Sequence, residues 1–155
     1  MTQAASQAPL EAPSKERLRL WLQLLKTTRA IESQLRENLR REFNTTLPRF
    51  DVMAALSRFD DGLKMSEISG ALRVSNGNVT GIVDRLAEDG LLVRVSVPGD
   101  RRAHRVRMTQ KGREEFARQA AAHEAWISEF LGQFDAAEAR AIAAEFNIEE
   151  SADAS

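Results

Sequence analysis

A short stretch in the middle of the chain combines side chains suited to hydrogen bonds with bases and glycines that leave room beside them. Asn78, Thr80 and Arg85 carry such donors and acceptors, and Gly77 and Gly81 lie among them. Two glycines on the exposed face of a helix cost about 1 kcal/mol each relative to alanine, so stability alone does not explain them. Close approach of the helix backbone to a DNA groove would explain both glycines. The alternative is that glycine is merely tolerated on a solvated surface.

A second group with chemical potential follows further along the chain. Arg101 and Arg102 come directly after Asp100 and the turn-forming pair Pro98-Gly99. Guanidinium groups near the end of a hairpin suit the negative potential of a narrow minor groove. We therefore expect a helix in the major groove and an arginine in the minor groove beside it.

The net charge of −1 conceals an uneven distribution of charge. Between positions 73 and 113, nine basic residues face four acidic ones, whereas two basic and ten acidic residues follow from position 114. A basic middle beside an acidic end is typical of a localised nucleic-acid surface. The alternative, which the charges alone do not separate, is that both runs are solvated helix faces.

The composition excludes several other classes of protein. Apolar residues make up 43% and charged residues 29%, which predicts a globular domain with a core of its own. The absence of cysteine excludes disulfides and thiolate metal sites, and His104 and His123 do not form a metal-binding constellation. We therefore predict neither a metal nor a cofactor. No apolar run approaches the roughly 20 residues of a membrane span, and residues 1–13 lack a signal pattern, so we expect a cytoplasmic protein.

The first expected helix, from about residue 14 to Phe43, is apolar on two faces. Its main stripe has helical spacing, and Leu20 and Leu24 widen it beyond one core face. A helix that is apolar on two sides must bury both sides against other apolar surfaces. We predict that a second subunit buries the second side. The main stripe consists of Leu18, Trp21, Leu22, Leu25, Thr28, Ile31, Leu35 and Leu39.

The central segment predicts two short helices, a strand and then a longer helix. Pro48 lies in the first turn of a helix whose inner face would extend to Phe59, and residues 60–62 would end it. Ser66 and Ser75 are expected to cap the next two helices, with Arg73-Val74 as the turn between them. The remaining expectations are a short strand at Leu63-Lys64, a buried stripe of Val79, Ile82, Val83 and Leu86, and Gly90 as the helix end.

Two further elements complete the expected order. Residues 91–97 and 104–108 alternate in strand fashion, and residues 98–103 would form the tip of their hairpin. Thr109 caps a long helix to about Phe130, with Phe116, Ala120, His123 and Ile127 on its inner face. Asp135 and Glu138 have the spacing of a capping box for a last short helix.

These motifs resemble the MarR family of bacterial winged helix-turn-helix regulators over about residues 15–146. The specific part lies between Ser75 and Thr109, where the order and the spacing both match. It consists of Val79-Thr-Gly-Ile-Val-Asp-Arg-Leu86, Gly90-Leu-Leu92, Asp100-Arg-Arg102 and Thr109-x-x-Gly112.

The resemblance implies a homodimer, built from the first and the last two helices, on a near-palindromic operator in double-stranded DNA. Arg102 matches the family's wing-tip arginine and Asp100 the acid that braces it. The expected DNA-binding residues are Ser75, Asn76, Gly77, Asn78, Thr80, Gly81, Arg85, Asp100, Arg101 and Arg102. A small aromatic or acyl effector would release DNA, and its expected pocket residues are Trp21, Arg29, Phe50 and Met53.

We thus predict a mainly α fold with a small β-wing, in which a winged helix-turn-helix is combined with N- and C-terminal dimerisation helices. A disordered tail (1–13) would precede one domain (14–155), with dimerisation helices at 14–45 and 110–148 and the winged lobe at 46–109. The favoured function is a ligand-responsive dimeric repressor. An enzyme is disfavoured because no Gly-rich loop, metal spacing or nucleophile–base pair is present. The alternative is an architectural or constitutive DNA-binding protein without an effector.

Overall fold

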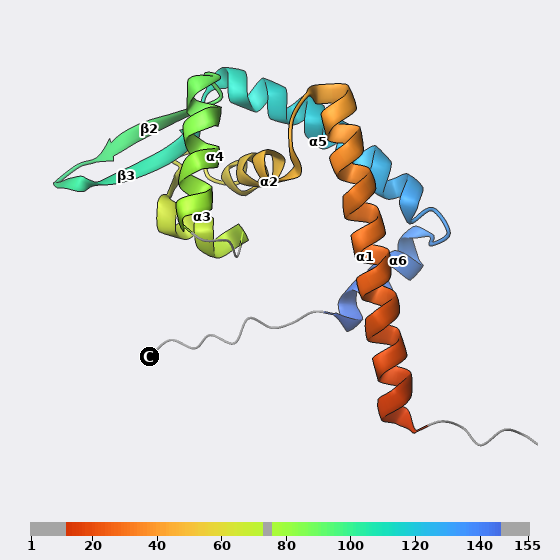
Figure 1. Cartoon of the computed structure of the whole chain (residues 1–155). Coiled ribbons are helices and arrows are strands. Elements are labelled where there is room, and N and C mark those ends of the chain that lie inside the picture. Colours follow the sequence, from red (N-terminus) through yellow and green to blue (C-terminus); the bar gives the residue numbers. More distant parts are fainter. Residues whose placement is uncertain (1–11, 73–75, 147–155) are drawn as a thin grey trace, which may run out of the picture. The chain divides into compact units, whose positions relative to one another are not determined.

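A computed structural model describes residues 12–72 and 76–146, with side chains at all of these positions except 76–77 and 101–103. The chain divides after Leu47 into two compact units. The first contains the helix α1 (Pro13–Phe43). The second carries the other elements (Figure 1): α2 (Leu47–Leu56), β1 (Leu63–Lys64), α3 (Met65–Leu72), α4 (Asn76–Glu88), β2 (Leu92–Val97), β3 (Asp100–Met108), α5 (Gln110–Phe130) and α6 (Ala136–Glu145).

Helix α1 begins and ends at residues with distinct backbone roles. Pro13 occupies the first turn, where its missing N–H costs no hydrogen bond, and Ala12 precedes it without a side-chain cap. The helix therefore begins one residue before its expected start near residue 14. Asn44 ends the helix in the left-handed region (φ 50°), and its N–H donates to the Arg40 carbonyl at 3.1 Å.

The apolar face of α1 is buried only toward its C-terminal end. Leu35 and Leu39 are buried together with Asn38. The N-terminal half exposes the large apolar side chains of Leu18, Leu20, Trp21, Leu22 and Leu24.

The three-stranded antiparallel sheet of the second unit has the order β1-β3-β2. Leu63 pairs with Val106, and Leu92 pairs with Met108. Gly62 precedes β1 with φ +86°, and a Cβ there would lie within 3.0 Å of the Val106 carbonyl oxygen, so only glycine fits. The hairpin of β2 and β3 projects beyond α4 (Figure 1).

The tip of this hairpin is shorter than expected. Val97 pairs with Asp100, which leaves only Pro98 and Gly99 to make the turn, and Gly99 has φ +84°. Residues 100–103 belong to β3 rather than to a loop. The prediction that the return strand starts at His104 was therefore wrong, because a two-residue turn with one positive φ closes the hairpin earlier.

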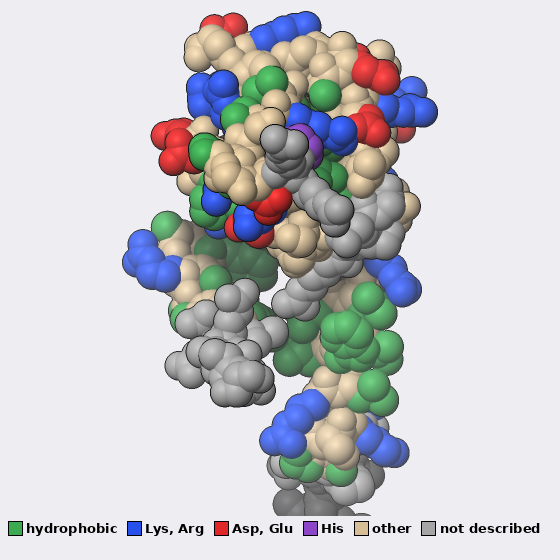
Figure 2. All heavy atoms as spheres, turned by 90° about the vertical axis from the view of Figure 1, so that its left-hand side faces the viewer, with side chains coloured by type: hydrophobic (Ala, Val, Ile, Leu, Met, Phe, Trp, Pro, Cys, Tyr) green, Lys and Arg blue, Asp and Glu red, His purple; other side chains and the backbone are tan. Residues whose placement is uncertain are grey.

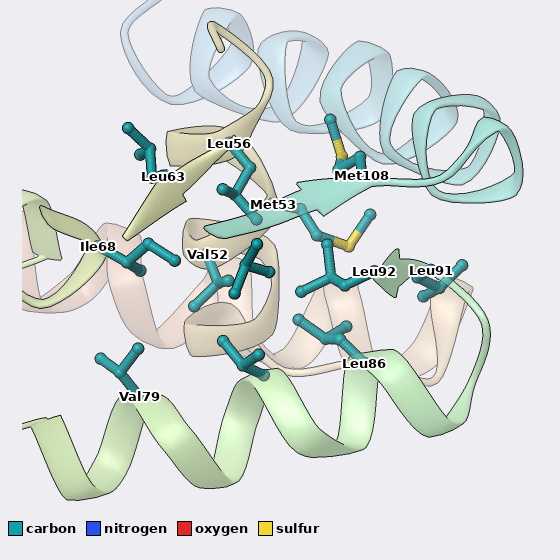
Figure 3. Packing of buried hydrophobic residues seen from close by; sticks show 12 residues of the cluster. Val52, Met53, Leu56, Leu63, Ile68, Val79, Leu86, Leu91, Leu92 and Met108 are labelled. Atoms are coloured by element: carbon teal, nitrogen blue, oxygen red, sulfur yellow. The ribbon is translucent and has the colours of Figure 1, made fainter. Parts of the chain in front are cut away.

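The hydrophobic core of the second unit lies between the sheet, α2, α3 and α4 (Figure 3). Val79, Val83 and Leu86 contribute the inner face of α4, and all three have no exposed surface. The other members are Val52, Met53, Leu56, Leu63, Ile68, Leu91, Leu92, Val106 and Met108.

Two helix boundaries differ from the expected ones. Helix α2 ends at Leu56, and the side chain of Phe59 is 48% exposed instead of continuing the inner face. The Ser57 hydroxyl donates to the Ala54 carbonyl at 2.6 Å, which competes with the backbone pattern of a longer helix. Helix α3 begins at Met65, so Ser66 lies inside it and is not its cap.

The last two helices begin as expected. Thr109 caps α5 by accepting the Gly112 N–H at 3.0 Å. Asp135 and Glu138 form the capping box of α6, and the Glu138 backbone N–H holds the pKa of Asp135 below its ordinary value. The buried residues of α5 are Gly112 and Gln119, whereas Ala120 is only half-buried. No residue of α6 is buried.

Candidate nucleic-acid interface

Helix α4 presents two sharply different faces. Its inward residues Val79, Val83 and Leu86 are fully buried, and Ile82 is half-buried. The opposite face is exposed at every described side chain, as the helical spacing predicted. That outer face consists of Asn78, Thr80, Gly81, Asp84 and Arg85. Four of these residues, all except Gly81, have side chains that can donate or accept hydrogen bonds without any loss of core packing.

The other residues expected at the interface lie at the ends of two elements. Asn76 and Gly77 are the first residues of α4, and Ser75 lies outside the described residues. Asp100 is exposed at the start of β3, followed by Arg101 and Arg102 in the same strand. The backbone thus places these arginines next to the turn of the hairpin.

The C-terminal end of α4 is fixed by contacts that reach two other helices. The Arg49 guanidinium on α2 donates to the Asp89 carboxylate, and the Lys111 ammonium on α5 donates to the Asp89 carbonyl at 2.9 Å. Gly90 follows with φ +76°, and its carbonyl accepts the Thr109 hydroxyl at 2.7 Å. These bonds hold α4 at a set position relative to α2 and α5.

A further ion pair connects α4 to the wing. The Arg94 guanidinium on β2 donates to the Asp84 carboxylate on the outer face of α4. Both side chains are about half exposed, so the pair contributes little to stability. Its effect is geometric, because it joins the base of the hairpin to the helix expected to enter the groove.

These pairs modify the expected electrostatics. Arg49 and Arg94 each lie against an acid, Asp89 and Asp84 respectively, so part of the positive charge is compensated within the unit. On the face seen in Figure 2, Lys and Arg side chains are interspersed with Asp and Glu. The positive field at this interface therefore depends on a few arginines more than on a broad patch.

The residues expected to hold an effector occur on two helices. Trp21, which is 56% exposed, and Arg29, also exposed, lie on α1. Phe50 and Met53 are buried on α2, and Met53 belongs to the hydrophobic core. Their assignment to a pocket stays a prediction.

An aromatic cluster missed by the sequence analysis surrounds Phe50. Its ring lies 5.5 Å from that of Phe116 and is stacked 4.6 Å from the imidazole of His123, centroid to centroid. Burial lowers the pKa of His123. The cluster joins α2 to α5 through contacts between rings.

Two other kinds of feature are absent from residues 12–72 and 76–146. No helix there is long and apolar enough to cross a bilayer. No group of three or more His, Cys, Asp or Glu side chains there is arranged to hold a metal ion.

The helices α3 and α4 followed by the β2–β3 hairpin define a winged helix-turn-helix protein. A family model described as the MarR family matches residues 43–103. The transcriptional activatory protein BadR of Rhodopseudomonas palustris is 31% identical over 140 residues, which cover 86% of this chain and 75% of BadR. The chain therefore belongs to the MarR family of transcriptional regulators.

Solved structures of the same family have the same fold. A MarR family regulator from Silicibacter pomeroyi is 32% identical, with a TM-score of 0.71 over 87% of this chain and 94% of that one. A mutant MarR from E. coli, solved in complex with operator DNA, has a TM-score of 0.72 at 20% identity, over 87% and 96% of the two chains. At this lower identity the likeness concerns the fold alone.

Proposed function

We propose that this protein is a transcriptional regulator that binds a near-palindromic operator in double-stranded DNA as a cytoplasmic homodimer. The observation that carries the proposal is the outer face of α4, which is exposed throughout while its inner face is anchored in the core. Asn78, Thr80 and Arg85 would contact base edges in the major groove. Ser75, Asn76 and the backbone at Gly77 and Gly81 would lie close to the DNA, and Arg101 and Arg102 would follow the adjacent minor groove, with Asp100 bracing Arg102.

The exposed apolar residues of α1 support a dimer. Five large side chains between Leu18 and Leu24 are each at least 36% exposed, and Ile142 and Phe146 at α6 are exposed as well. Exposed apolar surface of this extent is characteristic of a subunit interface. A stable homodimer of this kind buries on the order of 2,000 Å² or more.

The proposal is tested by footprinting on DNA selected from a random library, together with light scattering of the free protein. We expect a dimer mass at micromolar concentration and a footprint of two half-sites with centres roughly 10 base pairs apart. A monomer that protects a single asymmetric site would contradict both parts.

Gly81→Ala is expected to separate stability from DNA binding. A Cβ at this position meets nothing within 4 Å, so alanine should stabilise the helix by about 0.4–1 kcal/mol. In the operator complex the added methyl group would meet the DNA, and we expect about a tenfold loss of specific affinity. Gly70→Ala on α3, equally unobstructed, is the control that should stabilise without weakening DNA binding. Equal operator affinity for both variants would mean that the α4 backbone does not approach DNA.

Arg102→Ala is expected to weaken binding to all DNA sequences. A wing arginine in a narrow minor groove gains mainly from negative potential, so its loss should reduce the log–log salt slope by about one unit. Asn78→Ala is the uncharged comparison, and it should lower specificity while leaving the salt slope unchanged. If fluorescence anisotropy titrations of Arg102→Ala gave an unaltered salt slope, the wing would not contribute to DNA binding as proposed.

We further propose that the regulator is a repressor that a small aromatic or acyl ligand releases from DNA. Trp21, Phe50 and Met53 would contact its apolar part, and Arg29 its anionic group. A typical allosteric coupling of about 1–3 kcal/mol would suffice. The word activatory in the name of BadR favours activation as the second candidate, and in vitro transcription from the bound promoter separates the two roles.

Arg29→Ala is expected to abolish the response to such a ligand while DNA binding without ligand stays near wild type. The measurement is the operator dissociation constant with and without aromatic acids and their coenzyme A thioesters. Arg36→Ala, also on α1 and 59% exposed in its side chain, is the matched control. Release of DNA from Arg29→Ala at the wild-type ligand concentration would place the anchor elsewhere. A wild-type protein that responds to no ligand would favour the constitutive alternative.

A further inference from the structure

The second unit contains a cavity that the DNA interface does not use. It lies between the end of α2, the turn that follows it, the end of β3 and the first turns of α5, and its volume is about 200 Å³. Leu56, Met108 and Phe116 form its apolar floor, and the half-exposed ring of Phe59 lines its edge. Figure 3 shows Met108 pointing from the core toward α5. With Leu56, Met108 and Phe116 as its members, the floor is apolar and partly aromatic.

Two opposite charges line the same cavity without pairing. Asp60 lies on the turn after α2, and Arg113 on the first turns of α5. Among the described residues, neither side chain has a hydrogen bond or an ion pair, although most exposed arginines of α1 and Arg118 on α5 do have one. The carboxylate and the guanidinium line the same cavity but form no hydrogen bond with each other. Both charged groups are therefore available to a bound molecule.

We propose that this cavity binds a small zwitterion with an apolar, preferably aromatic, body, such as an aromatic amino acid. Arg113 would bind the ligand's carboxylate, Asp60 its ammonium group, and the floor its ring, for which Met108 offers a favourable sulfur–aromatic contact. A cavity of about 150 Å³ holds benzene, so about 200 Å³ admits one ring and part of a short chain. The volume is below the roughly 300 Å³ at which drug-sized sites begin, which excludes larger ligands.

The residues at the floor of the cavity connect it to helix α4. Leu56 and Met108 belong to the same core cluster as Leu86 of α4. Phe116 contacts the ring of Phe50, whose neighbour Arg49 holds Asp89 at the end of α4. A bound ligand is therefore expected to change operator affinity. This regulatory consequence rests on the proposed function, whereas binding to the cavity does not.

Calorimetry on the full chain without DNA tests the site with three probes of equal ring size. These are phenylalanine, 3-phenylpropanoate and 2-phenylethylamine, which carry both charges, only the negative one and only the positive one. We expect phenylalanine to bind at least about tenfold more tightly than either of the others. Arg113→Gln should weaken phenylalanine and phenylpropanoate but not phenylethylamine. Asp60→Asn should weaken phenylalanine and phenylethylamine but not phenylpropanoate.

The matched controls are Arg118→Gln and Asp61→Asn, which change neighbouring charges outside the cavity lining and should leave all three affinities unchanged. No saturable binding of phenylalanine up to about 10 mM, or equal effects of the cavity and control variants, would overturn the proposal. Operator titrations with phenylalanine form a separate arm. A ligand that binds without changing operator affinity supports the site and refutes only its regulatory role. A protein that fails to bind DNA without ligand refutes the proposed function and leaves the calorimetric result intact.

Discussion

Gly112→Ala is expected to lower the free energy of unfolding by about 2–3 kcal/mol. A Cβ at Gly112 would lie within 3.0 Å of the Leu91 carbonyl oxygen and against the Leu91 carbonyl carbon. Both are backbone atoms, so no side chain can rotate to make room. The clash is relieved only if α5 shifts. Such a shift would strain two hydrogen bonds, from the Thr109 N–H to the Leu91 carbonyl and from the Thr109 hydroxyl to the Gly90 carbonyl. Urea denaturation of the dialysed protein measures the loss.

The control for this substitution is Gly70→Ala, which introduces the same methyl group where nothing lies within 4 Å. We expect the two variants to change stability in opposite directions, because Gly70 lies inside α3 and alanine favours the helix. If Gly112→Ala were as stable as wild type, α5 would not approach Leu91 as closely as described.

Leu86→Ala is expected to cost about 2–5 kcal/mol, because its side chain is fully buried in the cluster that anchors α4. The space left by the removed side chain would lie directly beneath α4, so under the proposed function operator affinity should also fall at temperatures where the variant is still folded. Thermal unfolding and operator titration on the same preparation measure the two effects together.

Leu72→Ala provides the comparison, since Leu72 packs against the same cluster but is only partly buried. Its cost should be clearly smaller. Equal losses for Leu86→Ala and Leu72→Ala would show that the core beneath α4 collapses around the missing side chain.

The local features of the fold could be predicted from the sequence. Helical spacing identified Val79, Val83 and Leu86 as buried, and it left Asn78 and Thr80 outside. Pro98-Gly99 predicted the turn of the hairpin, and the caps at Thr109 and Asp135 follow from residue types a few positions apart. Such features depend on neighbours within about one or two turns of the chain, which a single sequence displays directly.

The contacts that position the site could not be predicted in this way. Arg49 and Asp89 are 40 residues apart, and nothing in their spacing indicates that they meet. Arg94 and Asp84 form a pair only because β2 folds back along α4. Gly112 belonged to a recognised motif, yet its close approach to Leu91 depends on how two elements cross.

The extent to which α1 is buried could not be predicted from the sequence either. The spacing of its apolar residues described a continuous stripe, but Leu18 and Trp21 are exposed whereas Leu35 and Leu39 are buried. The spacing of apolar residues identifies which face of a helix must be buried, but it does not identify the surface against which that face packs.

The separation of the two faces of α4 has a consequence for evolution. All of the helix's contribution to the core comes from Val79, Val83 and Leu86, with Ile82 in support, so substitutions at the outer positions leave folding almost unaffected. A duplicated gene could therefore accumulate changes at Asn78 without crossing the stability threshold that removes most mutants from a population. Under the proposed function, such a change would alter operator preference in a single step while the protein stays folded. The inner residues, in contrast, should tolerate little beyond other apolar side chains of similar volume.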